Sequence, residues 1–291
     1  MNHDIVRTSE QTSDFLSGFC TGTVHSVYQN TVNLRFSGHL LSLQVSGSVL
    51  SPISLITDLS PENFRKLDIA EEDPAFLQSG EISVRSSSGT CSFTCRQAEI
   101  VDLSLPAAIA KPLSESALSF LESQIAEALA IPFAKSQYEA GFQPLFSSPR
   151  TSSSVLLQTA GRIMNDSSSL FHEECFHESA VSLARLLGLG IGLTPSGDDF
   201  LCGALAGLLL SGREEHFFAY QLRREILRRL QDTGDISAAF LSCAAEGLFS
   251  LPVISLADLP DSEKIFSDFR RIGHSSGFDT LCGVLYGLRL K

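Results

Sequence analysis

The chain has 291 residues, a length that favours two domains over one. Of these residues 43% are hydrophobic and 19% are charged, a composition typical of a folded protein. The formal net charge of −12 argues against nucleic acid and anionic membrane surfaces as partners, since both bind clustered Lys and Arg. The start of the chain has no apolar signal core, and no apolar run approaches the roughly 20 residues that span a bilayer. With seven scattered cysteines, an odd number that favours free thiols, a cytoplasmic protein is expected.

The first part of the chain has the pattern of β-strands. From about residue 19 to residue 105, short runs of alternating apolar and polar residues are separated by Ser and Gly. A short helix is expected at residues 60–69, because Ser60 precedes Pro61 at the first helical position. We predict a β-barrel or sandwich within a domain of residues 1–110.

The remainder of the chain changes to a helical period after a proline-containing connector. Apolar residues recur at three- and four-residue spacing in residues 114–130, 173–187, 197–211, 213–231, 235–249, 261–271 and 277–290. Residues 144–155 read as a surface loop. Strands followed by helices predict an α+β protein, with an α-helical domain of residues 111–291.

This helical domain contains a duplicated loop-helix unit at residues 192–210 and 273–290. At an offset of 80, residues 196–210 and 276–290 are identical at ten of fifteen positions. Each copy opens Ser-Gly-x-Asp, which predicts a capping box at the start of a helix. Each then carries Gly-x-x-x-Gly, which costs helical stability unless another backbone packs closely. We therefore expect the two helices to pack on each other about a pseudo-two-fold axis, with their N-termini at one pocket.

The loops before these helices supply the candidate site. Hydrogen bonds to an anionic substrate are expected from the hydroxyl groups and backbone amides at the two helix starts. The candidate substrate-binding residues are Thr194, Ser196, Gly197, Asp199, Ser275, Ser276, Gly277 and Asp279. Asp198, which Phe278 replaces in the second copy, and His274, which replaces Thr194, are the candidate catalytic residues. Asp198 would orient an amide or a metal, and His274 would transfer a proton near neutral pH.

Other readings of these residues stay open. Ordinary helix capping accounts for Ser196, Asp199, Ser276 and Asp279 without any chemistry. The glycines of residues 192–197 have P-loop spacing without its lysine, so nucleotide binding is weakly supported. No metal site is predicted by a specific motif, although adjacent Asp198 and Asp199 leave Mg²⁺ possible.

Two further segments of the helical domain carry polar residues of interest. The segment TGDIS, residues 233–237, either lines the same pocket through Thr233, Asp235 and Ser237 or caps a helix. Residues 213–229 give one helix a basic face, interpreted as a solvated or subunit-facing surface on which a substrate-facing arginine is the alternative. Its arginines are Arg213, Arg223, Arg224, Arg228 and Arg229.

Three segments, GLTPSGDDFLCG, TGDIS and GHSSGFDTLCG, resemble a bacterial family that includes the AllH subunit of oxamate carbamoyltransferase. The resemblance runs along the whole chain but is most specific in these helical segments. It implies an assembly, working in allantoin and purine breakdown, that interconverts oxalurate plus phosphate with oxamate plus carbamoyl phosphate. It also implies other protein subunits as partners, and it assigns no catalytic residue.

Three functional hypotheses follow. The first is a subunit of a carbamoyltransferase-type enzyme that binds a small anionic substrate at the paired helix N-termini. The second is a non-catalytic scaffold or regulatory subunit, in which the glycine-rich face and the arginine helix serve assembly. The third and weakest is a Mg²⁺-dependent hydrolase that uses Asp198, Asp199 and Asp279.

Overall fold

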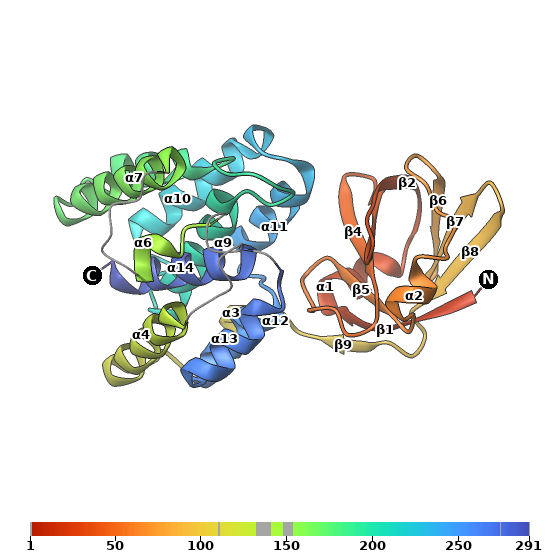
Figure 1. Ribbon diagram of the computed structural model, residues 1–291, viewed down its shortest axis with the longest axis horizontal. Coiled ribbons are helices and arrows are strands. Elements are labelled where there is room, and N and C mark those ends of the chain that lie inside the picture. The colour runs from red at the N-terminus through yellow and green to blue at the C-terminus, as the bar shows by residue number, and fades with distance from the viewer. Residues whose placement is uncertain (1, 110, 132–140, 148–153, 274, 291) are drawn as a thin grey trace. The chain divides into compact units, whose positions relative to one another are not determined.

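A computed structural model describes residues 2–109, 111–131, 141–147, 154–273 and 275–290 of the chain. The chain divides into two compact units, Met1–Leu103 and Ser104–Lys291. The first unit is a mixed β-barrel and the second is helical, so the predicted α+β class is confirmed (Figure 1). No helix among the described residues is long and apolar enough to cross a membrane. All seven cysteines are free thiols.

The barrel unit is built from nine strands and two short helices. Its strands are β1 (Asn2–Ser9), β2 (Phe19–Val27), β3 (Thr31–Phe36), β4 (His39–Gln44), β5 (Ser54–Thr57), β6 (Pro74–Gln78), β7 (Glu81–Ser86), β8 (Gly89–Thr94) and β9 (Glu99–Val101). The order β5-β4-β3-β2-β6-β7-β8-β1 closes into a ring because β1 pairs again with β5, and β9 adds to β1. The β4–β5, β1–β8 and β1–β9 pairs are parallel, and the other pairs are antiparallel.

Strand β1 precedes the residues in which strands were expected, and it is the strand that closes the barrel. It runs parallel to β8 from Asn2 to Asp4, and antiparallel to β5 from Ile5 to Thr8. Buried positions alternate along β6, β7 and β8, as the period-two pattern predicted. The two helices are α1 (Glu10–Leu16) and α2 (Pro61–Phe64), and Ser60 caps α2 as expected, although α2 ends earlier than residue 69.

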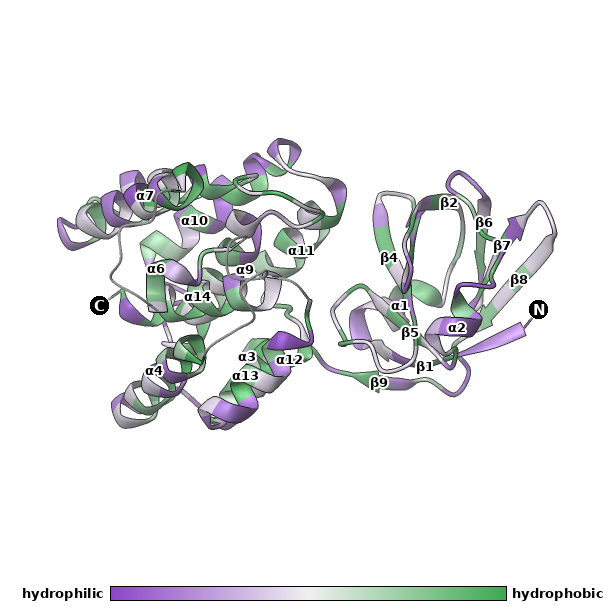
Figure 2. Ribbon diagram, viewed as in Figure 1, coloured by the Kyte–Doolittle hydropathy of each residue, from purple (hydrophilic) through white to green (hydrophobic). Residues whose placement is uncertain are grey.

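The helical unit contains eleven described α-helices. They are α3 (Leu105–Ala108), α4 (Glu115–Ala130), α6 (Pro144–Ser147), α7 (Val155–His172), α8 (Phe176–Leu183), α9 (Ser196–Leu210), α10 (Phe217–Arg228), α11 (Asp235–Ala245), α12 (Leu251–Ile254), α13 (Ser262–Arg270) and α14 (Ser276–Arg289). Helix α7 was not predicted, and α6 begins the segment expected to be a loop, of which residues 148–153 lie outside the described chain. Figure 2 colours α14 mostly green, whereas α7 alternates between purple and green.

The two repeated helices, α9 and α14, cross with their backbones in contact. A Cβ added at Gly203 would overlap the carbonyl oxygen of Thr280, and one added at Gly283 would overlap that of Phe200. A Cβ at Gly207 would lie 3.0 Å from the Cα of Gly287. These contacts exchange under the same 80-residue offset, so the predicted close packing about a pseudo-two-fold axis is confirmed.

The contacts also fix the relative direction of the two helices. Gly203 lies against Thr280, and Gly207, one turn later, lies against Val284 and Gly287. Both helices therefore run the same way, and their N-termini lie at the same end of the crossing.

Replacing a crossing glycine tests this packing. Gly203→Ala should lower the free energy of unfolding by about 1–3 kcal/mol or more, because two backbones must separate to admit the methyl group. Gly161→Ala on α7 is the matched control, because its added Cβ would lie 3.6 Å from a Leu145 methyl group, an ordinary contact. Helix propensity predicts a gain of about 1 kcal/mol for the control. Equal urea-unfolding curves for Gly203→Ala and the wild type would contradict the close crossing.

Candidate functional site

The segments that lead into α9 and α14 meet at the N-terminal end of the crossing. The Oγ1 of Thr194 lies 2.9 Å from the Oγ of Ser276, although 82 residues separate them in sequence. Both side chains are only partly buried. The expected convergence of the two helix starts is therefore present.

Neither helix start has the predicted capping box. The N-caps are Pro195 for α9 and Ser275 for α14, and neither makes a side-chain cap hydrogen bond. Ser196 and Ser276 are instead the first residues of their helices. Since each helix begins one residue early, Asp199 and Asp279 fall in the fourth position rather than the third, and a side chain there does not reach back to the N-cap amide.

The serines act on the aspartates of the other copy. Burial raises the pKa of Asp199 in α9, and hydrogen bonds from the Ser276 hydroxyl of α14 and from Thr194 oppose this effect. In the reciprocal arrangement, burial raises the pKa of Asp279 in α14, and the Ser196 hydroxyl of α9 is among the groups that oppose it. The repeat therefore provides two acids, each facing the hydroxyl group of the opposite helix.

Asp279 is fully buried beneath the turn that precedes α6. Its Oδ1 accepts a 2.6 Å hydrogen bond from the backbone amide of Phe142. The backbone of Gly141 lies so close that an added Cβ would be 2.6 Å from this oxygen. Burial raises the pKa of Asp279 to about 7, against the opposing effect of the Phe142 amide and the nearby hydroxyl groups. Its Oδ2 is buried and forms no hydrogen bond with any described residue.

Asp199 is the more accessible of the two acids. The residue is partly exposed, yet its Oδ2 is buried and has no hydrogen-bond partner among the described residues. Burial raises the pKa of Asp199 well above its ordinary value, and the charges of Asp279 and Asp198 raise it further. The Thr194 and Ser276 hydroxyls only partly offset these effects. Asp199 therefore keeps its proton to a higher pH than an exposed aspartate does.

Asp198 has a different environment from the two acids. Its Oδ1 accepts a 2.7 Å hydrogen bond from the amide of Gly188, and its Oδ2 accepts one from the Thr233 hydroxyl. Both carboxylate oxygens of this buried residue are thus occupied by protein donors. Asp198 ties the start of α9 to the preceding segment and to the segment before α11.

The predicted backbone donors are also constrained. The amide of Gly197 donates to the carbonyl oxygen of Leu189 at 2.8 Å, so it is not available to a substrate in this conformation. Gly197 and Gly277 pack tightly on the carbonyl groups of Leu186 and Phe269, respectively. Close packing, rather than anion binding, is sufficient reason for glycine at both positions.

The other candidate residues have varied environments. His274 lies outside the described residues, so its predicted role stays a prediction. Thr233 joins the site through Asp198, as described above, and Ser237 has a buried Oγ with no hydrogen-bond partner in the described chain. Within that same part of the chain, no group of three or more His, Cys, Asp or Glu side chains is arranged to hold a metal ion.

Sequence reasoning did not identify Gly141, Phe142 or Gly188. Each contributes through its backbone, by an amide donor or by close packing, and such contacts leave no periodic signal in the sequence. Thr233 was recognised as a possible pocket residue, but its bond to Asp198 was not foreseen.

The comparison with protein families accounts for both units. Residues 4–100 match the AllH family N-terminal domain, and residues 186–288 match the family described as oxamate carbamoyltransferase subunit AllH. The barrel unit thus corresponds to the N-terminal domain of this family, and the helical unit contains the segment that matches subunit AllH. The chain belongs to the AllH family. No solved structure matches it.

The raised pKa of Asp279 predicts how the free energy of unfolding depends on pH. Its pKa rises from 3.8 to about 7 on folding, so between these values the folded protein holds a proton that the unfolded chain has released. The contribution of Asp279 to the free energy of unfolding therefore falls as pH rises from 4 to 7, and is constant above that. Asp279→Asn removes this loss and should be stabilised relative to the wild type at pH 8, by about 4 kcal/mol at most.

Urea unfolding at pH 5 and pH 8 measures the effect. Asp166→Asn, an exposed aspartate variant on α7, controls for the loss of one charge. If the difference between Asp279→Asn and the wild type is the same at both pH values, Asp279 titrates normally and its assigned environment is wrong.

Proposed function

We propose that this chain is a subunit of an oxamate carbamoyltransferase and that the paired starts of α9 and α14 bind the carbamoyl-bearing substrate. The observation that carries the proposal is the pair of buried carboxyl oxygens, Oδ2 of Asp199 and of Asp279, that have no partner in the described chain. Leaving such groups unpaired costs about 1–3 kcal/mol each, which an incoming polar ligand offsets. Family membership supports the reaction class.

The chemistry of the site suits a ligand with both an amide and an anionic group. The NH₂ group of a carbamoyl compound donates to the Oδ2 of Asp199, which is the more accessible acid. Thr194 and Ser276, whose hydroxyl groups lie 2.9 Å apart and bond each other in this conformation, would rotate their hydroxyl protons toward carboxylate or phosphate oxygens when the ligand binds. Ser196, Ser275 and the backbone at Gly277 complete the wall beside Asp279.

This proposal assigns different roles to the three aspartates. Asp198, whose oxygens are both occupied, positions the start of α9. Asp279 lacks exposed surface and acts through Asp199, whose pKa its charge raises. Asp199 is the acid that contacts the substrate. His274, which lies outside the described residues, remains a candidate proton carrier.

In the direction of oxalurate cleavage, a phosphate oxygen forms a bond to the carbamoyl carbon. The bond from that carbon to the oxamate nitrogen then breaks, and the nitrogen must receive a proton. Protonated Asp199 donates this proton and becomes a carboxylate, and the proton that the attacking hydrogen phosphate loses on forming carbamoyl phosphate restores the acid. A raised pKa is suited to the step because the acid keeps its proton to a higher pH than an exposed aspartate does.

The family description names a subunit, so the proposed activity belongs to an assembly with other chains. No metal ion is required by this scheme. A Mg²⁺-dependent hydrolase would need carboxylate ligands, and both oxygens of Asp198 are occupied by protein donors.

Turnover of the reconstituted complex tests the proposal. With partner subunits present, Asp199→Asn should reduce phosphate-dependent oxalurate cleavage by about 100-fold or more, the usual contribution of a general acid. Asp166→Asn is the matched control and should retain wild-type turnover. Size-exclusion chromatography must show that both variants still assemble.

The pH profile distinguishes Asp279 from Asp199. Because the charge of Asp279 raises the pKa of Asp199, Asp279→Asn should lower that pKa. Activity that depends on protonated Asp199 should then decline at a lower pH than in the wild type. An unshifted profile would show that Asp279 does not act through Asp199.

The scaffold alternative predicts a different result. A complex that assembles and turns over normally with Asp199→Asn and with Thr194→Val would assign the chemistry to the other subunits. The exposed Phe217, Tyr220 and Leu227 on α10 would then be the first surface to examine for assembly contacts.

A further inference from the structure

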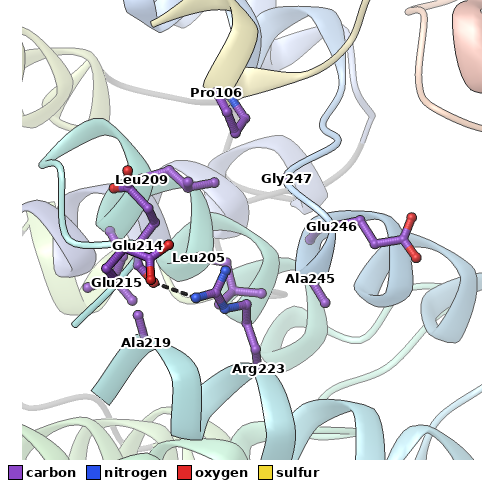
Figure 3. Close-up of a pocket in the computed structure, with 12 residues that line it drawn as sticks. Pro106, Leu205, Leu209, Glu214, Glu215, Ala219, Arg223, Ala245, Glu246 and Gly247 are labelled. Carbon is purple, nitrogen blue, oxygen red and sulfur yellow. Dashed lines mark hydrogen bonds between the residues drawn. The ribbon is translucent and has the colours of Figure 1, made fainter. Parts of the chain in front are cut away.

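A cavity lies at the opposite end of α9 from the candidate site. It has a volume of about 340 Å³, the size of a small-molecule pocket. Its wall is formed by the C-terminal half of α9, the turn after it, the start of α10 and the end of α11 (Figure 3). No residue of the candidate site lines it.

The wall of this cavity is apolar, with charged groups of both signs. Leu205, Leu208, Leu209, Ala219 and Ala244 supply apolar surface. The charged residues are Arg223 on α10, Glu214 and Glu215 in the turn before α10, and Glu246 after α11. Figure 3 shows Arg223 pointing toward Glu214 and Glu215, whereas the side chain of Glu246 points away.

Two of these charged groups have unused hydrogen-bonding capacity. Arg223 donates to the backbone carbonyl oxygen of Glu214, and no carboxylate pairs with its guanidinium among the described residues. The Oε2 of Glu214 is buried without a hydrogen-bond partner in that part of the chain. A guanidinium with free donors suits a carboxylate, and a carboxylate oxygen without a partner suits a charged N–H donor.

The helix ends around the cavity also favour one cationic and one anionic group. α9 and α11 direct their C-terminal ends at it, and a helix C-terminus favours a cation. Ala219, which also lines the cavity, lies in the first turn of α10, and a helix N-terminus favours an anion. The three carboxylates make the cavity net negative, so a lone anion is disfavoured, and a lone cation would leave the free donors of Arg223 without a partner.

We propose that this cavity binds a small amino acid zwitterion, with its carboxylate on Arg223, its ammonium group on Glu214 and its carbon chain against the leucines of α9. The site is independent of the proposed carbamoyl site, because it uses other residues at the other end of α9.

Calorimetry on the full chain with three zwitterions tests the proposal. Glycine, β-alanine and γ-aminobutyrate present the two charges at increasing separation, and at least one of them should bind. For γ-aminobutyrate, butyrate and n-butylamine are the matched single-charge probes. Butyrate and n-butylamine should each bind the wild-type protein at least about tenfold more weakly than the best zwitterion.

Variants assign the binding to this cavity. Arg223→Gln and Glu214→Gln should each weaken zwitterion binding about tenfold or more. Arg224→Gln, a change at the next position of α10, is the control and should leave affinity unchanged, since Glu225 keeps its 3.0 Å contact with Arg228. Thermal melts check that each variant is folded. Glu214→Gln preserves side-chain shape, so it decides the question if Arg223→Gln does not fold.

Three results would overturn the proposal: no heat with any of the three zwitterions, equal affinity for n-butylamine or butyrate, or binding that both Arg223→Gln and Glu214→Gln leave intact. Loss of carbamoyl transfer in Asp199→Asn has no bearing on this outcome, so the two proposals fail separately.

Discussion

The contact between the backbones of α9 and α14 is the constraint on which the helical unit depends. Four glycines allow it, at a cost in helix propensity of about 1 kcal/mol each, and the close contact of two helices offsets that cost. A parallel crossing at this distance leaves little freedom in how the helix starts are placed. It brings the hydroxyl groups of Thr194 and Ser276 together, and with them two acids that the chain order separates by 80 residues. The geometry of the site thus depends on four crossing positions that have no side chain.

A symmetric crossing carries an asymmetric site because the surroundings of its two halves differ. Asp198 accepts hydrogen bonds from Gly188 and Thr233 in the first copy. Its counterpart Phe278 packs beside Phe266, with ring centroids 5.6 Å apart. The Oδ1 of Asp279 accepts the backbone amide of Phe142, whereas Asp199 has the hydroxyl groups of Thr194 and Ser276 as neighbours. The two acids therefore differ in burial and in partners although they derive from one repeated motif. That difference lets one acid contact a substrate while the other sets its pKa.

What could be predicted from sequence was whatever depends on local period or on the repeat. The strands, most helices and the crossing of α9 with α14 follow from alternation, three-four spacing and paired glycines. The capping box failed because Pro195 places the start of α9 one residue earlier, a shift too small for a pattern to resolve. Strand β1 was missed because its pairing partners lie in β5 and β8, far along the chain. The hydrogen bond from the Phe142 amide to Asp279 was missed because any residue except proline can supply a backbone amide.

The electrostatics of the helix starts depend on two opposing effects. The N-terminal dipoles of α9 and α14 favour ionised carboxylates, an effect of about 0.3–1 kcal/mol for each helix at an exposed site. Removing a carboxylate from water costs several kcal/mol, so burial prevails and the pKa values of Asp199 and Asp279 rise. An anionic substrate consequently meets two acids that keep their protons to a higher pH than exposed aspartates do, rather than two fully ionised carboxylates. Burial of the acids is thus what makes a site of aspartates compatible with an anionic ligand, and it leaves them able to donate a proton.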